Sequence, residues 1–327
     1  MPAINSEEVI CVSIYKPEGY LLESAENRQA LKSIQGLQDA LDHGKILEGR
    51  AVVCDADHNL IVDLGCMKGV IPRHETAVGI DDGTTRDIAI ISRVNKPVCF
   101  RITGFKHMKD GTAQAMLSRR TVQQQCMKDY IQHLQPGDII PAKVTHLEQF
   151  GCFVDIGCGI PSLVPIDSIS VSRISHPRDR FTVGQNIKVI VKEILPEGRI
   201  VLTHKELLGT WEENAALFAA GETVAGIVRS VEDYGVFVEL TPNLAGLAEP
   251  KENVYAGQQT SVYIKSLIPQ KMKVKLIIVD AFDAAYKTED PVYFIQDNHI
   301  DSWRYSPSSS ERIVETIFGD SLEDDSI

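Results

Sequence analysis

The chain has 327 residues, of which 43% are hydrophobic and 24% charged, and its formal net charge is −12. This length allows roughly two or three domains, and the composition is that of ordinary soluble proteins. No run of about 18 apolar residues is present, and the chain starts with early acids instead of a basic segment. We therefore expect neither a membrane-spanning helix nor a secretion signal.

The seven cysteines are scattered singly, and none forms a Cys-x-x-Cys pair. This pattern argues against a zinc ribbon and is typical of a reduced, cytoplasmic protein. We expect no cofactor and no membrane partner.

The negative charge is concentrated at the two ends of the chain. Residues 1–46 carry a net charge of −3 and residues 281–327 carry −8, which leaves −1 for residues 47–280. Nucleic-acid binding favours a local positive patch, and the middle of the chain has room for one. Net charge alone therefore does not decide the class of partner.

The first predicted element is a helix within residues 23–42. Apolar residues recur at three- and four-residue spacing from Leu31 to Leu41. This spacing predicts one buried stripe on the helix.

From residue 47 onward the chain consists of short β-branched runs separated by Gly, Pro and Asp. Three stretches look alike, and they open at Gly49, Gly137 and Gly221. Their interval exceeds the ~20–50 residues of solenoid repeats, so they predict repeated domains. Five short runs in about seventy residues are typical of a small Greek-key barrel of the oligonucleotide-binding (OB) type.

We therefore predict a fold dominated by β-structure: three tandem five-stranded OB barrels joined by short helices, with a helical N-terminal segment and an irregular, acidic C-terminal extension. The predicted boundaries are 1–46 for the N-terminal segment, 47–120 for the first barrel, 121–134 for a linker helix, 135–205 for the second barrel, 206–220 for a second linker helix, 221–280 for the third barrel and 281–327 for the extension.

Within the extension, residues 291–295 are predicted to form a strand and residues 310–318 a short helix with a serine cap. Trp303 and Tyr305 are expected to pack on the third barrel. The acidic end, 320–327, is expected to be disordered.

The second barrel holds the most informative motif, Phe150-Gly151-Cys152-Phe153. In a regular strand the two rings would face opposite sides, but Gly151 allows a bend that places both on one side. Two exposed rings would form a stacking platform for nucleic-acid bases. Each stacked base would contribute about 1–3 kcal/mol to the free energy of binding. The pattern leaves the alternative open that both rings fill the barrel core.

Four residues near this pair are candidates for phosphate contacts: Lys143, His146, Arg199 and Lys205.

The third barrel repeats the motif, with Tyr234 and Phe237 as the two aromatic residues. Arg229 directly precedes this region and is a further candidate contact. A core position would tolerate Leu or Ile, so aromatic residues at the same place in two repeats favour stacking.

No catalytic motif accompanies these barrels. The sequence contains no Walker A loop, no dinucleotide-binding glycine motif after a strand, no HExxH and no GxSxG. Asp63, Asp155 and Glu239 recur at one repeat position, which indicates a structural or surface feature of the fold instead of an acid/base pair. We expect Asp155 to face solvent, and we predict that the protein is not an enzyme.

The aromatic motif at Phe150, together with Ser162-Leu-Val-Pro165 and the run from Gly198 to Thr203, resembles the S1 RNA-binding domain. Three such units in a row make residues 47–280 similar to the bacterial ribosomal protein S1 family. The resemblance implies five-stranded OB barrels that bind single-stranded RNA, here mRNA in translation on the small ribosomal subunit.

The match to the family's RNA-contacting positions is partial. Phe150, Phe153 and Arg199 match in the second barrel, but Pro165 and Leu195 stand where the family has a histidine and an aspartate. In the third barrel Tyr234 and Phe237 match, Lys273 lies near the arginine position, and Glu249 replaces the histidine.

The first barrel has His58 and Ile61 at the positions of the two rings. The resemblance implies that this barrel lost the platform and contacts protein, namely proteins of the small ribosomal subunit. Two other functions remain open. In the first, the barrels are protein-interaction or regulatory modules in transcription or RNA decay. In the second, they are accessory domains of a nuclease, for whose catalytic domain the chain leaves no room.

Overall fold

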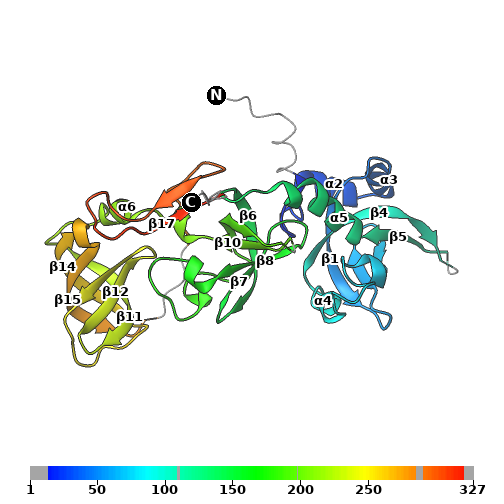
Figure 1. The fold of residues 1–327 in the computed structure, drawn as a ribbon. Helices are drawn as coiled ribbons and strands as arrows, with labels where there is room; N and C mark the ends of the chain where they lie inside the picture. The colour runs from blue at the N-terminus through cyan, green and yellow to red at the C-terminus, as the bar shows by residue number, and fades with distance from the viewer. Residues whose placement is uncertain (1–13, 109–110, 197, 285–289, 320–327) are drawn as a thin grey trace, which may run out of the picture. The chain divides into compact units, whose positions relative to one another are not determined.

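The computed structural model describes residues 14–108, 111–196, 198–284 and 290–319 (Figure 1). The chain divides into two compact units. The first unit contains residues 1–134 and 155–161, and the second unit contains residues 135–154 and 162–327.

Three closed five-stranded barrels form the fold, which confirms the predicted fold class. The first barrel has the strand order β1-β2-β3-β5-β4. Its strands are β1 (Leu47–Cys54), β2 (Leu60–Asp63), β3 (Lys68–Ile71), β4 (Pro97–His107) and β5 (Ala113–Ser118). The 3-10 helix η1 (Arg73–Glu75) and the helix α4 (Ile88–Ile91) lie between β3 and β4 in the chain.

The N-terminal segment contains two described helices where the sequence pattern predicted one. They are α2 (Ala25–Leu31) and α3 (Ile34–Asp42). The break occurs because Ser33 is extended and its side chain accepts a hydrogen bond from the Gly36 N–H, which caps a new helix.

The second barrel has the order β10-β8-β7-β6-β9. It follows α5 (Arg120–Asp129) and η2 (Ile131–His133). Its strands are β6 (Ile139–Glu148), β7 (Gly151–Asp155), β8 (Pro161–Pro165), β9 (Asn186–Ile194) and β10 (Ile200–Thr203), with η3 (Ile166–Ser168) and η4 (Pro177–Asp179) between β8 and β9. Glu197, between β9 and β10 in the chain, lies outside the described residues.

The third barrel has the order β11-β12-β13-β15-β14. It follows η5 (Lys205–Leu208) and α6 (Trp211–Ala215). Its strands are β11 (Thr223–Glu232), β12 (Gly235–Thr241), β13 (Leu244–Ala248), β14 (Gln259–Ile268) and β15 (Lys273–Phe282), with η6 (Pro269–Lys271) between the last two.

The C-terminal extension differs from the prediction. Residues 291–295 form no strand, and instead of a helix over 310–318 the structure has the strand β17 (Glu315–Ile317) paired with β16 (Ser302–Arg304). The pairing of these two segments overrides the weak local helix signal, as tertiary contacts commonly do. The acidic end, 320–327, lies outside the described residues.

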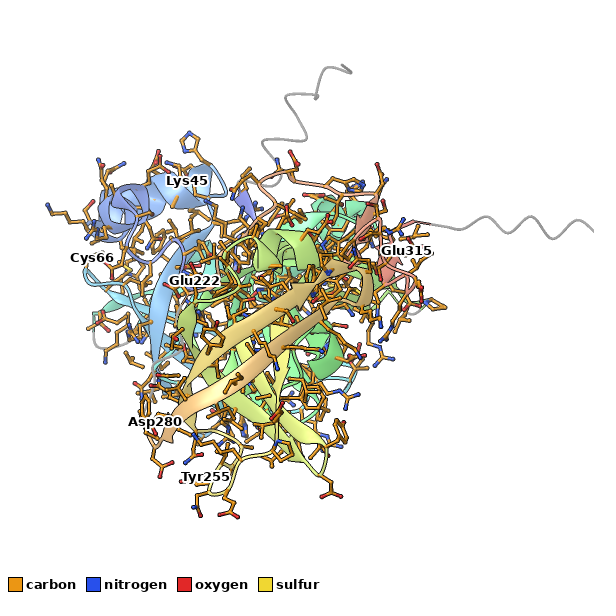
Figure 2. All side chains as sticks on the ribbon, turned by 90° about the vertical axis from the view of Figure 1, so that its left-hand side faces the viewer. Lys45, Cys66, Glu222, Tyr255, Asp280 and Glu315 are labelled. Atoms are coloured by element: carbon orange, nitrogen blue, oxygen red, sulfur yellow. The ribbon has the colours of Figure 1, made fainter. Side chains whose placement is uncertain are left out.

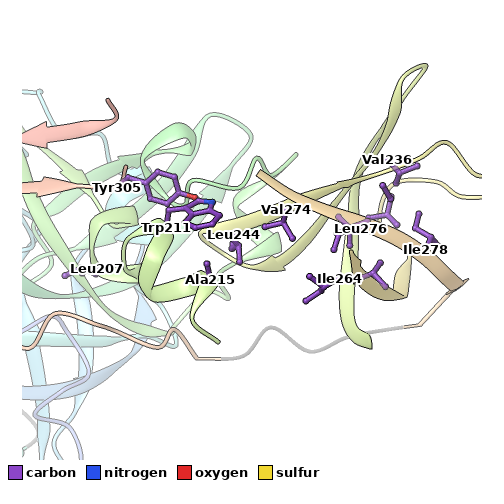
Figure 3. Packing of buried hydrophobic residues seen from close by; sticks show 14 of the residues in the cluster. Leu207, Trp211, Ala215, Val236, Leu244, Ile264, Val274, Leu276, Ile278 and Tyr305 are labelled. Carbon is purple, nitrogen blue, oxygen red and sulfur yellow. The ribbon is translucent and has the colours of Figure 1, made fainter. Parts of the chain in front are cut away.

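Each unit has its own hydrophobic core. In the first unit the interior of the first barrel packs with Leu37 of α3. In the second unit one core joins the interior of the third barrel to Trp211 of α6 and to Trp303 and Tyr305 of the extension (Figure 3). The Tyr305 hydroxyl donates a 2.6 Å hydrogen bond to the Asn243 carbonyl, so the expectation that this aromatic pair packs on the third barrel is confirmed.

Two of the three recurring carboxylates are buried. Asp155 is 3% exposed and accepts hydrogen bonds from the backbone N–H groups of Glu18, Gly157 and Gly159, so the expectation that it faces solvent is wrong. Burial raises the pKa of Asp155 to about 6. Glu239 is buried as well, whereas Asp63 is exposed.

Over the described residues, no helix has both the length and the apolar character needed to cross a membrane.

Candidate functional site

The aromatic motif of the second barrel places both rings outside the barrel. Phe150 is 57% exposed in the turn before β7, and Phe153 on β7 is half-buried. Between and after them, Cys152 and Val154 point into the core and are fully buried. The alternative that both rings fill the core is therefore wrong.

The two rings meet edge to face. Their centroids are 5.9 Å apart with an interplanar angle of 89°. The imidazole of His146, at the end of β6, lies 6.4 Å from the Phe153 ring. Three of the predicted site residues thus form one exposed cluster.

A close approach between strands explains why glycine separates the two rings. A Cβ atom on Gly151 would lie 2.6 Å from the Val164 carbonyl oxygen of β8. In the third barrel, a Cβ on Gly235 would lie 2.5 Å from the Ala248 carbonyl oxygen of β13. Only glycine allows the neighbouring strand to approach so closely at this point.

The third barrel repeats the ring geometry. Tyr234 is 67% exposed and Phe237 half-buried, and their centroids are 6.1 Å apart at 88°. Two barrels of the second unit therefore carry the same exposed edge-to-face pair at the same repeat position. Exposed rings of this kind can stack unpaired bases.

The candidate phosphate contacts of the second barrel lie at several places. Lys143 is half-buried on β6, and Arg199 is exposed directly before β10. The Nζ of Lys205, in η5, donates to the Asp167 carbonyl at 3.4 Å. The exposed His146 forms a 2.6 Å contact from Nε2 to Glu148 Oε1, so this side chain already has an acidic partner.

Arg229 is placed differently from the expectation. Its side chain is 9% exposed and donates hydrogen bonds of 2.8 and 3.0 Å to the two carboxylate oxygens of Glu239. The Nη1 atom of Arg229 also lies 3.7 Å from a carboxylate oxygen of Asp179. Burial and these two acids commit the guanidinium to a structural ion pair, so we correct its assignment as an RNA contact.

Lys273 is exposed at the start of β15, and Glu249 is exposed directly after β13.

Sequence reasoning missed two neighbours of the rings, Leu247 and Lys275. Phe237 pairs with Leu247, and Leu247 pairs with Lys275, so these three residues form one row across β12, β13 and β15. The alternation of lysine and apolar residues from Lys273 to Leu276 was the available sequence signal for Lys275, whereas the sequence of β13 has no such alternation.

The first barrel has an aliphatic row where the other barrels have rings. Val53 pairs with Ile61, Ile61 with Val70, and Val70 with Met116. Val53 is 49% exposed, and the other three are half-buried. His58 has φ 60° in a turn held by the Asp55 carboxylate, which accepts from the Asp57 and Asn59 N–H groups.

The described residues contain no group of three or more His, Cys, Asp or Glu side chains arranged to hold a metal ion. Burial raises the pKa of Cys152 to about 12, so this residue behind the platform stays a neutral thiol.

Comparisons with known proteins support the resemblance read from the motifs. The model of the S1 RNA binding domain family matches residues 133–205, which comprise the second barrel. The small ribosomal subunit protein bS1 of Staphylococcus aureus (strain COL) is 29% identical over 277 residues, which cover 80% of this chain and 68% of that protein.

The small ribosomal subunit protein bS1 of Rhizobium meliloti (strain 1021) is 28% identical over 287 residues, which cover 82% of this chain and 49% of that protein. Among solved structures, a multidomain protein with nucleic acid binding domains from Streptococcus pneumoniae TIGR4 is 15% identical, with a TM-score of 0.24, and covers 72% of this chain. The similarity to ribosomal protein S1 that the motifs indicated is confirmed.

Proposed function

Because the model of the S1 RNA binding domain family matches its second barrel, we propose that this protein binds single-stranded RNA through the second and third barrels. One observation carries the proposal: both barrels present an exposed edge-to-face aromatic pair at the same repeat position. Each stacked base contributes about 1–3 kcal/mol, and stacking does not require a particular sequence. RNA binding with little sequence preference follows.

Phosphate contacts accompany the stacking. We propose Lys143, His146, Arg199 and Lys205 in the second barrel and Lys273 in the third. Each contact releases condensed counterions, so RNA affinity falls as the salt concentration rises.

We further propose that the RNA is mRNA and that binding takes place on the small ribosomal subunit. The support is that relatives similar over four fifths of this chain are small ribosomal subunit proteins. The first barrel is then the contact with small-subunit proteins, since its row of Val53, Ile61, Val70 and Met116 offers an aliphatic surface instead of rings.

Fluorescence anisotropy with a labelled single-stranded RNA at two salt concentrations tests the RNA-binding proposal. Phe150→Ala and Phe153→Ala are each expected to weaken binding by about 1–3 kcal/mol. Tyr255→Ala is the matched control, because Tyr255 is an exposed ring whose hydroxyl bonds to Asp283 and which lies outside both aromatic pairs. Unchanged affinity in both phenylalanine variants refutes the stacking platform.

Co-sedimentation with purified small ribosomal subunits tests the role of the first barrel. Ile61→Glu should abolish co-sedimentation while leaving the affinity for free RNA unchanged. Val183→Glu, at an exposed apolar position of the second barrel, is the control. If Ile61→Glu still co-sediments, the first barrel is not the ribosome contact. If the protein binds a partner but no RNA, it is a protein-interaction module.

A further inference from the structure

The hairpin of β14 and β15 is the part of the third barrel where positive charge collects. Residues 253–279 contain four lysines and no acidic residue, in a chain with a net charge of −12. The four are Lys265, Lys271, Lys273 and Lys275, and all of them are exposed. This segment therefore offers a local positive surface, which is the feature that phosphate binding requires.

An aromatic ring lies on the outer face of the same hairpin. Tyr263 is 38% exposed in the middle of β14, although its chain neighbours Val262 and Ile264 are fully buried. Figure 2 looks onto this side of the barrel, where β14 and β15 run across the front of the view from Asp280 at the lower left towards the upper right. A ring this exposed in mid-strand contributes little to the barrel interior and is available to a ligand.

The lysines and the ring lie on one face. Lys265 follows Tyr263 by two positions, and both side chains are exposed on β14, although the pairing with β15 has a bulge at Lys265. Ile277 pairs with Tyr263 across the strands, and Lys275 precedes Ile277 by two positions on the same face of β15. Ile277 therefore lies beside Tyr263. On each strand one lysine, Lys265 on β14 and Lys275 on β15, lies closer to the tip of the hairpin.

This face is continuous with the aromatic pair. Phe237 pairs with Leu247, and Leu247 pairs with Lys275, so exposed or half-buried side chains lead from β12 across β13 to β15. Tyr263 lies one strand further on. At about 4.8 Å between neighbouring strands, the path from β12 to β14 is roughly 14 Å around the barrel.

We propose that this face is a second stacking position on the third barrel, where Tyr263 stacks a base of single-stranded RNA and Lys265 and Lys275 bind the adjacent phosphates. It rests on the proposed function, because it extends the path of the RNA beyond Tyr234 and Phe237. An acidic protein segment would form ion pairs with the lysines. It would not provide a flat group to stack on the ring of Tyr263.

The test uses the full chain, fluorescence anisotropy and a labelled oligouridylate of ~30 nucleotides, long enough for two barrels at ~4–16 nucleotides each. Tyr263→Leu keeps an apolar side chain and removes the ring. It should weaken binding about 5- to 150-fold without changing the salt dependence. Lys265→Gln with Lys275→Gln should lower the slope of log affinity against log salt by ~1.4, since two phosphate contacts are lost.

Matched controls are Tyr255→Leu, an exposed ring bonded to Asp283, and Lys128→Gln, an exposed lysine of α5. Both should bind RNA as the unchanged protein does. Circular dichroism melts of all variants confirm that the barrels are folded.

Three outcomes would overturn the proposal. If the Tyr263 and lysine variants bind like their controls while Phe153→Ala loses affinity, the hairpin face is not part of the RNA path and the proposed function stands. If only the lysine variant loses affinity, the face is electrostatic and the stacking assignment is wrong. If the unchanged protein shows no salt-sensitive RNA binding, the proposed function fails together with its extension.

Discussion

Arg180 and Glu239 form a buried ion pair, although 59 positions separate them in the chain. Arg180 lies directly after η4, before β9 of the second barrel, and Glu239 lies on β12 of the third. Their side chains are 7% and 5% exposed. Because Arg229 donates two hydrogen bonds to the same carboxylate, one acid holds two guanidinium groups inside the second unit.

Glu239→Gln should lower the free energy of unfolding of the second unit by about 3–5 kcal/mol, because it leaves two arginines buried without their shared acid. Urea denaturation followed by tryptophan fluorescence measures this. Both tryptophans of the chain, Trp211 and Trp303, lie in the second unit. Glu252→Gln, at an exposed position, is the control and should stay within about 0.5 kcal/mol. A loss below about 1 kcal/mol for Glu239→Gln would show that the pair is not structural.

Gly151→Ala should damage the platform without removing a ring. The added Cβ meets the Val164 carbonyl oxygen at 2.6 Å, so β7 and β8 must separate. We expect a stability loss of about 1–3 kcal/mol and weaker RNA binding. Gly104→Ala on β4 is the control, since its Cβ meets no atom within 4 Å. If thermal melting and RNA affinity of Gly151→Ala equal those of the control, the close approach is not what positions the rings.

The barrels and the aromatic platform were predictable because both depend on local patterns. Short β-branched runs between glycines specify strands, and the two aromatic-Gly-x-aromatic motifs mark one repeat position. The sequence left open whether both rings are exposed, since strict alternation places Phe150 and Phe153 on opposite faces and the close approach at Gly151 depends on the neighbouring strand.

The ion pair of Arg180 and Glu239 could not be predicted from local sequence patterns. Sequence alone placed Arg229 at the RNA and treated Glu239 as a feature of each repeat, because nothing in the motif indicates that Arg180, 59 positions earlier, shares the Glu239 carboxylate. The same limit explains the missed strand Glu315–Ile317, which exists through its pairing with Ser302–Arg304. Contacts between distant segments decided both cases.

His204 should make the second unit sensitive to acid. Its ring is fully buried, Nδ1 donates to the Ile169 carbonyl at 2.9 Å, and burial lowers the pKa of His204 to about 4. An unfolded histidine titrates near pH ~6.5. Between pH 6.5 and 4 the unfolded chain therefore takes up a proton that the folded unit excludes, and stability falls by about 3 kcal/mol.

Urea titrations of tryptophan fluorescence at several pH values measure this effect. His204→Gln keeps an N–H donor for Ile169 but cannot titrate in this range, so its stability should be lower at pH 7 and flatter towards pH 4. His176→Gln, in the loop before η4, is the control and should retain the pH dependence of the unchanged protein. Equal pH dependence in the unchanged protein and His204→Gln would mean that His204 is not the responsible group.

Two aromatic pairs in one compact unit predict that RNA affinity depends on RNA length. An RNA long enough to reach both pairs gains from the second contact as an intramolecular event, whereas a short RNA occupies one barrel at a time. Tyr234→Ala with Phe237→Ala should therefore weaken an oligouridylate of ~30 nucleotides at least about tenfold but one of ~8 nucleotides by about twofold or less, because the short RNA still binds at Phe150 and Phe153. Anisotropy at constant salt measures the ratio of the Kd of the variant to that of the unchanged protein at both RNA lengths, with Tyr255→Ala as the control. Equal ratios at the two lengths would mean that the barrels bind RNA independently.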